Sequence, residues 1–82
     1  MELKDTISMM TSGDYKERFR AEYFQLKIRY DKLKDMVCKY EDGTLDFEPS
    51  CPIDVLEAQL EAMANYIDML VIRATIEKVN IY

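Results

Sequence analysis

The sequence has no histidine and no tryptophan, and it has only two glycines, two prolines and two cysteines among 82 residues. Without histidine, the chain can build no Ser-His-Asp triad, no cysteine–histidine pair and no Glu-x-x-His di-iron site. So few glycines and prolines argue against an all-β domain, which needs many tight turns. No uncharged run is long enough for a membrane span, and the first ten residues lack the apolar core of a secretory signal. We therefore expect neither membrane association nor histidine-based catalysis.

The composition is that of a folded chain. Apolar residues make up 49% of it, charged residues 33% and aromatic residues 11%, which is too apolar for an intrinsically disordered protein. The length predicts one domain, residues 1–82. A net charge of −5 argues against binding to DNA or RNA. Cys38 and Cys51 fit a reducing compartment, and we expect packed or cap-position thiols, with no disulfide.

Charge is distributed unevenly along the chain. Eight basic and four acidic residues lie between Tyr15 and Tyr40, whereas eight acidic residues and no basic one lie between Glu41 and Ile72. Two antiparallel helices of opposite sign would attract each other, and this is the simplest interpretation. A local anion site on the basic segment is compatible with it. The pattern is therefore stronger evidence for a fold than for a ligand.

Residues 14–42 carry an apolar repeat of about 3.5 residues, the pattern of a helix packed along its length. The repeat consists of Phe19, Tyr23, Leu26, Tyr30, Leu33, Val37 and Tyr40. Ser12 or Asp14 can cap the start of this helix, and Gly43 suits the left-handed residue that ends it. Phe24 and Ile28 lie off the repeat, on a second apolar face.

Residues 52–79 form the second expected helix, after a loop over residues 43–51. Pro52 suits the first helical position, with Ser50 or Cys51 as the cap. One face consists of Ile53, Leu56, Leu60, Met63, Ile67, Leu70 and Ala74. More than half of the helix circumference is apolar, because a flank of Val55, Ala62, Met69 and Ile76 adds to that face.

The N-terminal segment, residues 1–13, predicts a short helix or arm with Leu3, Ile7 and Met10 on one face. The expected fold is therefore all-α: a long antiparallel helical hairpin with a short N-terminal helix or arm. Two helices cannot bury all the apolar faces of so small a chain. We expect hairpins to pack side by side into a homo-oligomeric helical bundle.

The start of the basic helix is the most ligand-like place in the sequence. Free backbone N–H groups there, followed by basic side chains, can hold phosphate while an aromatic ring stacks on a base. The residues concerned are Tyr15, Lys16, Arg18, Phe19, Arg20 and Lys27. The alternative is that the tyrosines lie at bundle seams with one end in water. Nothing in the pattern pairs a nucleophile with a base or gathers a metal cluster, so we expect no catalytic residue, no metal and no cofactor.

Two stretches are similar to a known group of phage proteins. They are the run Tyr15-Lys16-Glu17-Arg18-Phe19-Arg20-Ala21-Glu22-Tyr23 and, in the helix after Cys51-Pro52, the segment Leu60-Glu61-Ala62-Met63. With them the chain resembles, over nearly its whole length, small phage proteins related to a crAss-like phage protein. The resemblance implies a phage origin and action in the cytoplasm of the host bacterium.

The two-helix layout is also similar to the anti-CBASS cyclic-nucleotide sponges of phages. That family begins its helix with D-x-x-E-R-[FY], here Asp14, Glu17, Arg18 and Phe19, and has a lysine further along, here Lys27. Its last helix has a stretch that ends in arginine, and the counterparts here are Leu60, Glu61, Met63, Tyr66 and Arg73. The resemblance implies a helical oligomer that sequesters cyclic di- or trinucleotides without cleaving them.

The same resemblance suggests roles for individual residues. It places Lys27 on the ligand phosphates, and we expect Arg18 or Arg20 to assist. Tyr15 substitutes for a stacking tyrosine that the family has in a segment that does not align here. We therefore expect a phage counter-defence protein that is not an enzyme. The alternative is a small inhibitor or adaptor that occupies a host protein surface with its acidic helix, and a third reading is a purely structural oligomer.

Overall fold

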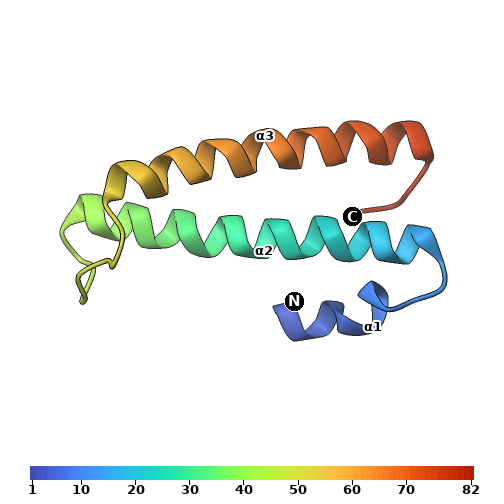
Figure 1. Ribbon diagram of the computed structural model, residues 1–82, viewed down its shortest axis with the longest axis horizontal. Coiled ribbons are helices and arrows are strands. Elements are labelled where there is room, and N and C mark those ends of the chain that lie inside the picture. The colour runs from blue at the N-terminus through green and yellow to red at the C-terminus, as the bar shows by residue number, and fades with distance from the viewer.

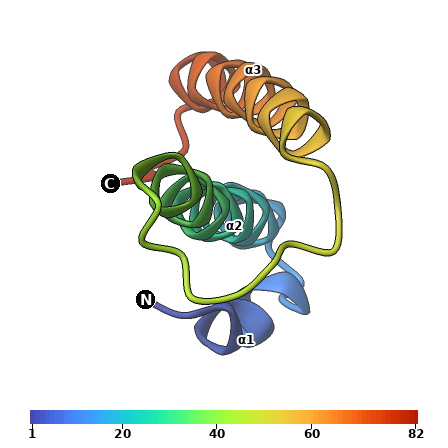
Figure 2. The ribbon, with the colours of Figure 1, turned by 90° about the vertical axis from the view of Figure 1, so that its left-hand side faces the viewer.

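A computed structural model describes all 82 residues and shows an all-helical chain (Figure 1). It consists of a short 3₁₀ helix η1, Leu3–Thr6, followed by α1, Ile7–Met10, α2, Tyr15–Asp42, and α3, Ile53–Glu77. Seen end-on, α3, α2 and the N-terminal arm are stacked in that order, with α2 in the middle (Figure 2). The predicted all-α hairpin with an N-terminal arm is confirmed. No helix is long and apolar enough to cross a membrane.

Both ends of α2 form as the sequence predicts. The Asp14 carboxylate accepts a hydrogen bond of 3.0 Å from the backbone N–H of Lys16. At the other end Gly43 adopts a φ of 75°, and its N–H donates to the carbonyl of Tyr40 at 3.1 Å. Such a left-handed residue closes a helix at little cost only when it is glycine.

The predicted cap of α3 is wrong. Pro52 takes the N-cap position with an extended ψ of 142°, so the helix begins at Ile53 and neither Ser50 nor Cys51 caps it. The extended backbone of Pro52 separates those two side chains from the first free N–H groups. Instead, the Asp54 carboxylate accepts a hydrogen bond of 2.9 Å from the N–H of Val55. The helix ends at Glu77, and the C-cap residue Lys78 is left-handed with a φ of 57°.

The core is small and lies at one end of the hairpin. Only eight of the 82 residues are buried. The main cluster consists of Phe19, Leu70, Ala74, Val79 and Ile81. Val79 and Ile81 belong to the C-terminal tail, which folds back beside α2 (Figures 1 and 2). The tail is therefore docked. Beyond this cluster the apolar repeat of α2 is half-buried, except that Val37 is buried and Tyr40 is exposed.

The arm packs on α2 through a different face from the one predicted. Thr6 is fully buried, and its hydroxyl accepts a 2.9 Å hydrogen bond from the Gln25 amide. Leu3 and Met9 are half-buried, whereas Ile7 is 55% exposed. The prediction assumed α-helical spacing throughout. The arm begins as a 3₁₀ helix with three residues per turn, so positions three apart turn inward.

Candidate functional site

An open groove of about 380 Å³ runs between the arm, α2 and α3. Its volume is within the range of small-molecule sites. The arm contributes one side chain, α2 contributes five and α3 contributes one. The lining residues are Met10, Arg18, Glu22, Gln25, Leu26, Arg29 and Tyr66. We call this space the arm groove.

The helical repeat of α2 explains which side chains line the arm groove. Arg18, Glu22, Gln25 and Arg29 follow one another at spacings of four, three and four residues, which places them on one face of a helix. This face lies between the face of α2 that contacts α3 and the face that contacts the arm. The C-terminal tail occupies the other flank of α2 (Figure 2), where the Lys16 ammonium donates to the Lys78 carbonyl at 3.5 Å.

The two arginines of the arm groove have no carboxylate partner. All four ion pairs of the chain join residues of the same helix or of the arm. No ion pair connects α2 to α3, so the opposite charges of the two helices do not meet in direct contacts. Arg18 is held in place by a hydrogen bond of 2.7 Å that its Nη1 donates to the Ser12 carbonyl. Arg29 is exposed and unpaired. Both guanidinium groups are therefore available to an anion.

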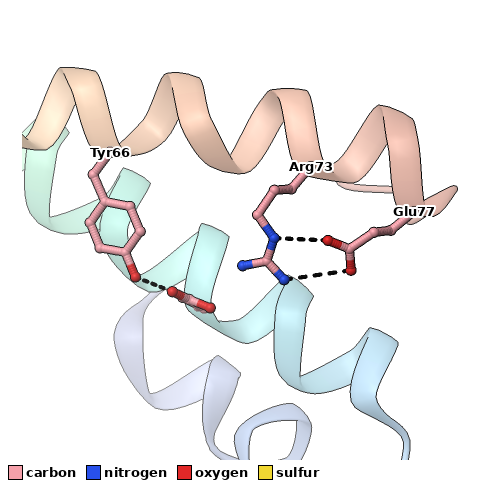
Figure 3. Close-up of polar contacts among 4 residues, drawn as sticks. Tyr66, Arg73 and Glu77 are labelled. Atoms are coloured by element: carbon pink, nitrogen blue, oxygen red, sulfur yellow. Dashed lines mark hydrogen bonds and ion pairs between the residues drawn. The ribbon is translucent and has the colours of Figure 1, made fainter.

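Tyr66 forms the α3 wall of the arm groove. Its hydroxyl donates a hydrogen bond to the Glu22 carboxylate across the two helices (Figure 3). This hydrogen bond is the main reason that the pKa of Tyr66 is raised, with partial burial adding to it. The side chain remains 45% exposed. The ring is thus fixed in position while one part of it stays open to a ligand.

A second polar cluster lies on the same side of the hairpin, nearer to the start of α2. The Arg73 guanidinium lies 4.8 Å from the centre of the Phe19 ring and donates to the Glu77 carboxylate at 2.8 Å (Figure 3). That hydrogen bond lowers the pKa of Glu77. Desolvation, followed by the charge of Glu77, raises the pKa of Tyr15. Tyr15, Arg73 and Glu77 therefore form one cluster, with the Arg73 charge already neutralised by Glu77.

The structure divides the predicted ligand residues between two flanks of α2. Tyr15, Arg18 and Arg73 lie on the side of the arm groove. Lys27 is nine residues from Arg18, about half a helical turn around α2, and Arg20 is on that far side too. The Lys27 ammonium pairs with Asp31 at 3.0 Å, and this hydrogen bond is the main reason that its pKa is raised. One small anion cannot contact Arg18 and Lys27 of the same chain.

Of the seven lining residues only Arg18 was a predicted ligand residue, and the missed ones include Glu22, Arg29 and Tyr66. The signal for the first two was present, because a polar stripe at positions 18, 22, 25 and 29 can be read from the sequence. Tyr66 could not be found in this way. Its contribution depends on which part of α3 lies opposite Glu22, and this is a property of the packed hairpin.

Two other cavities lie at the loop end of the hairpin and fit an anion less well. One is lined by Asp35 and Asp46 together with Lys39, which already pairs with Asp35 at 3.0 Å. The other has Glu48 on its wall and no basic residue. Negative charge would repel phosphate from both, so the arm groove is the site we consider further.

Comparison with known proteins gave one match. The model of the family described as Sequestin matches residues 13–76. The matched region contains α2, the loop and nearly all of α3, and it leaves out the N-terminal arm and the C-terminal tail. No match was found among curated proteins or among solved structures.

Proposed function

This chain belongs to the Sequestin family, and we propose that it captures a cyclic di- or trinucleotide signal without cleaving it. The family description supports a sequestering role, and the nature of the ligand is our inference. Such a protein would act by stoichiometric capture, as a phage counter-defence protein in the cytoplasm of the host bacterium. It would be a homo-oligomer and not an enzyme.

The arm groove is the observation that carries the proposal. A cyclic oligonucleotide offers at least two phosphates and two flat bases. The arm groove offers the unpaired guanidinium groups of Arg18 and Arg29, about 16 Å apart along α2 by helical rise, and the exposed ring of Tyr66 between α2 and α3. Guanidinium groups bind phosphate oxygens through charge-assisted hydrogen bonds, and aromatic rings stack on bases.

The chemistry of the arm groove also favours capture over turnover. Its lining contains no histidine, cysteine, serine or lysine, and the raised pKa of its one hydroxyl, on Tyr66, makes that group a poor nucleophile. The one carboxylate, on Glu22, is engaged by the Tyr66 hydroxyl. A bound nucleotide would therefore be held unchanged.

The resemblance to anti-CBASS sponges places Lys27 on the phosphates, while the geometry favours Arg18 and Arg29. These two assignments predict different mutant phenotypes, because Lys27 lies on the opposite flank of α2. We propose the arm groove as the binding site, with Tyr15 and Arg73 at its far end. Lys27 and Arg20 would bind ligand only on the other flank of the chain.

Native mass spectrometry with a panel of cyclic di- and trinucleotides tests the proposal. We expect intact nucleotide bound to the wild-type chain in a fixed ratio. Loss of one charge-assisted hydrogen bond to a phosphate costs about 1.5–3 kcal/mol, so Arg18→Ala and Arg29→Ala should each weaken binding by about ten- to a hundredfold. Lys39→Ala, which removes a positive charge at the other end of α2, is the matched control and should bind as the wild type does.

Other results would contradict the proposal in different ways. If Lys27→Ala abolishes binding and the two arginine variants do not, the ligand binds the other flank and the arm groove is not the site. If no nucleotide binds while the chain retains a bacterial protein from a lysate, the chain is an inhibitor or adaptor. If the nucleotide is recovered cleaved, the chain is an enzyme.

A further inference from the structure

Helix α3 carries a second apolar seam that nothing in the single chain covers. Its members follow one another at spacings of three and four residues over the whole helix, the repeat of a helix packed against another helix. They are Val55, Ala58, Ala62, Asn65, Met69, Ile72 and Ile76. All seven are exposed, with Ile76 72% and Met69 55% exposed. We call this set the outer seam.

The outer seam is separate from the face that α3 turns toward α2. That inner face uses Leu56, Met63 and Leu70, which are half-buried or buried. The outer seam contains no charged residue, and Asn65 at its centre is its only polar member. An uncharged stripe along an entire helix is typical of an interaction surface. A single polar residue in such a stripe is a known means of setting helix register.

We propose that the outer seam packs against the outer seam of a second copy of this chain, with the two α3 helices antiparallel. The arrangement of large and small residues about Asn65 carries this inference. In an antiparallel pair centred on Asn65, two residues face each other when their sequence numbers add up to 130 or 131. Ala62 then faces Met69 of its partner, and Ala58 faces Ile72. Every small side chain thus meets a large one.

The parallel arrangement lacks this complementarity. It would place each residue opposite its own copy, so that alanines meet at positions 58 and 62 while large side chains meet at positions 69, 72 and 76. The two helices would have to lie close together at the alanines and far apart at the large side chains. Voids would form at one end of the seam, or the other end would be overpacked. The antiparallel pairing keeps the separation of the two helices uniform.

One charge contact opposes the antiparallel pair. Glu61 and Asp68 border the outer seam on one side. Their sequence numbers add up to 129, close to the sum for facing residues. Glu61 would therefore lie near Asp68 of its partner. Exposed like-charge pairs are weak and are screened by salt, so they do not outweigh packing along seven positions. They do predict that added salt tightens self-association.

The pairing has a consequence for the arm groove. Tyr66 is adjacent to Asn65 and borders the outer seam on the side of the arm groove. A twofold axis beside Asn65 brings the Tyr66 side chains of the two protomers close together and opens both arm grooves on the same face. A ligand larger than one arm groove could then contact both protomers. The dimer itself requires no ligand, so it can be tested without nucleotide.

Analytical ultracentrifugation of the full chain without nucleotide is the first test. We expect the wild type to sediment as a dimer or as an even-numbered assembly. Met69→Glu should weaken self-association at least about tenfold. Ile7→Glu is the matched control, because Ile7 is also 55% exposed but lies on the arm. A monomeric wild type, or a Met69→Glu variant that associates as tightly as the wild type, would overturn the proposal.

Disulfide trapping tests the antiparallel direction. In a background with Cys38→Ser and Cys51→Ser, Asn65→Cys should form a covalent dimer on oxidation, since residue 65 meets its own copy. Val55→Cys should not, because an antiparallel pair keeps the two copies of residue 55 about 30 Å apart, beyond the reach of a disulfide. Efficient trapping through Val55→Cys would show a parallel pair. Failure of Asn65→Cys to cross-link would show that the axis lies elsewhere, and either result overturns the proposal.

Reversing the charge at the seam border provides an independent check. Glu61→Lys places a positive charge near Asp68 of the partner and should tighten self-association in the antiparallel dimer. In a parallel pair, residue 61 lies near the uncharged Tyr66 instead, so the same substitution would have little effect. Unchanged or weaker association of Glu61→Lys would contradict the proposed direction.

Discussion

The Tyr66 hydroxyl donates to the Glu22 carboxylate, a side chain–side chain hydrogen bond that joins α3 to the middle of the arm-groove face of α2. The same two residues line the arm groove. The contact therefore links the packing of the hairpin to the shape of the candidate site. It also explains how a tyrosine that is nearly half exposed can have a defined orientation.

We expect Tyr66→Phe to lower the free energy of unfolding by about 0.5–1 kcal/mol, since a partly exposed hydrogen bond to a carboxylate is lost. Urea denaturation measures this difference. The pKa of Tyr66 is raised in the folded state, so the contribution is present below about pH 10, the unfolded value, and is lost as the pH rises through the folded pKa. The wild type and the variant should therefore converge above pH 10. A difference that persists unchanged there would count against this hydrogen bond.

Glu57→Gln should stabilise the chain at neutral pH. A hydrogen bond shared with Glu41, followed by burial and the charge of Glu41, raises the pKa of Glu57. A raised folded-state pKa means that the stabilising contribution is present below about pH 4 and is lost as the pH rises through the folded value. Glutamine mimics the protonated form, so the urea midpoint should rise at pH 7 and match the wild type near pH 4. Equal midpoints at pH 7 would show that the two carboxylates do not interact.

The docked C-terminal tail predicts a large effect of a substitution beyond the end of α3. Ile81 is only 3% exposed within the main cluster, so Ile81→Ala should cost about 2–4 kcal/mol of unfolding free energy. Tyr82→Ala is the control, because Tyr82 is 95% exposed and should have almost no effect. Similar stabilities of the two variants would mean that the tail is not docked in solution.

Alanine substitutions of the two glycines provide a matched test of backbone strain. Neither has an atom within 4 Å of an added Cβ, so substitution by alanine causes no steric clash at either site. Only Gly43 has a positive φ. Gly43→Ala should therefore cost about 1 kcal/mol through backbone strain alone, whereas Gly13→Ala should be close to neutral. Thermal unfolding of both variants checks this, and a neutral Gly43→Ala would indicate that α2 ends differently.

Much of the fold could be read from the sequence, because it depends on local rules. The 3.5-residue repeat, the Asp14 cap and Gly43 define α2, and the structure has it at Tyr15–Asp42. The face of the arm could not be read, because the choice of a 3₁₀ start depends on contacts such as the one between Thr6 and Gln25. The cap of α3 was missed for a similar reason, since the backbone of Pro52 decides it.

The candidate site shows the same division between local and tertiary information. The sequence by itself determined that α2 is basic, that α3 is acidic and largely apolar, and that both are long helices, since composition and periodicity are properties of a single chain segment. The spacing of nine residues also places Arg18 and Lys27 on opposite flanks of α2, but only the tertiary structure decided that the flank of Arg18 shares a groove with Tyr66. That decision depends on which side of α2 receives the arm and which receives the C-terminal tail, and those contacts join residues that are far apart in the sequence.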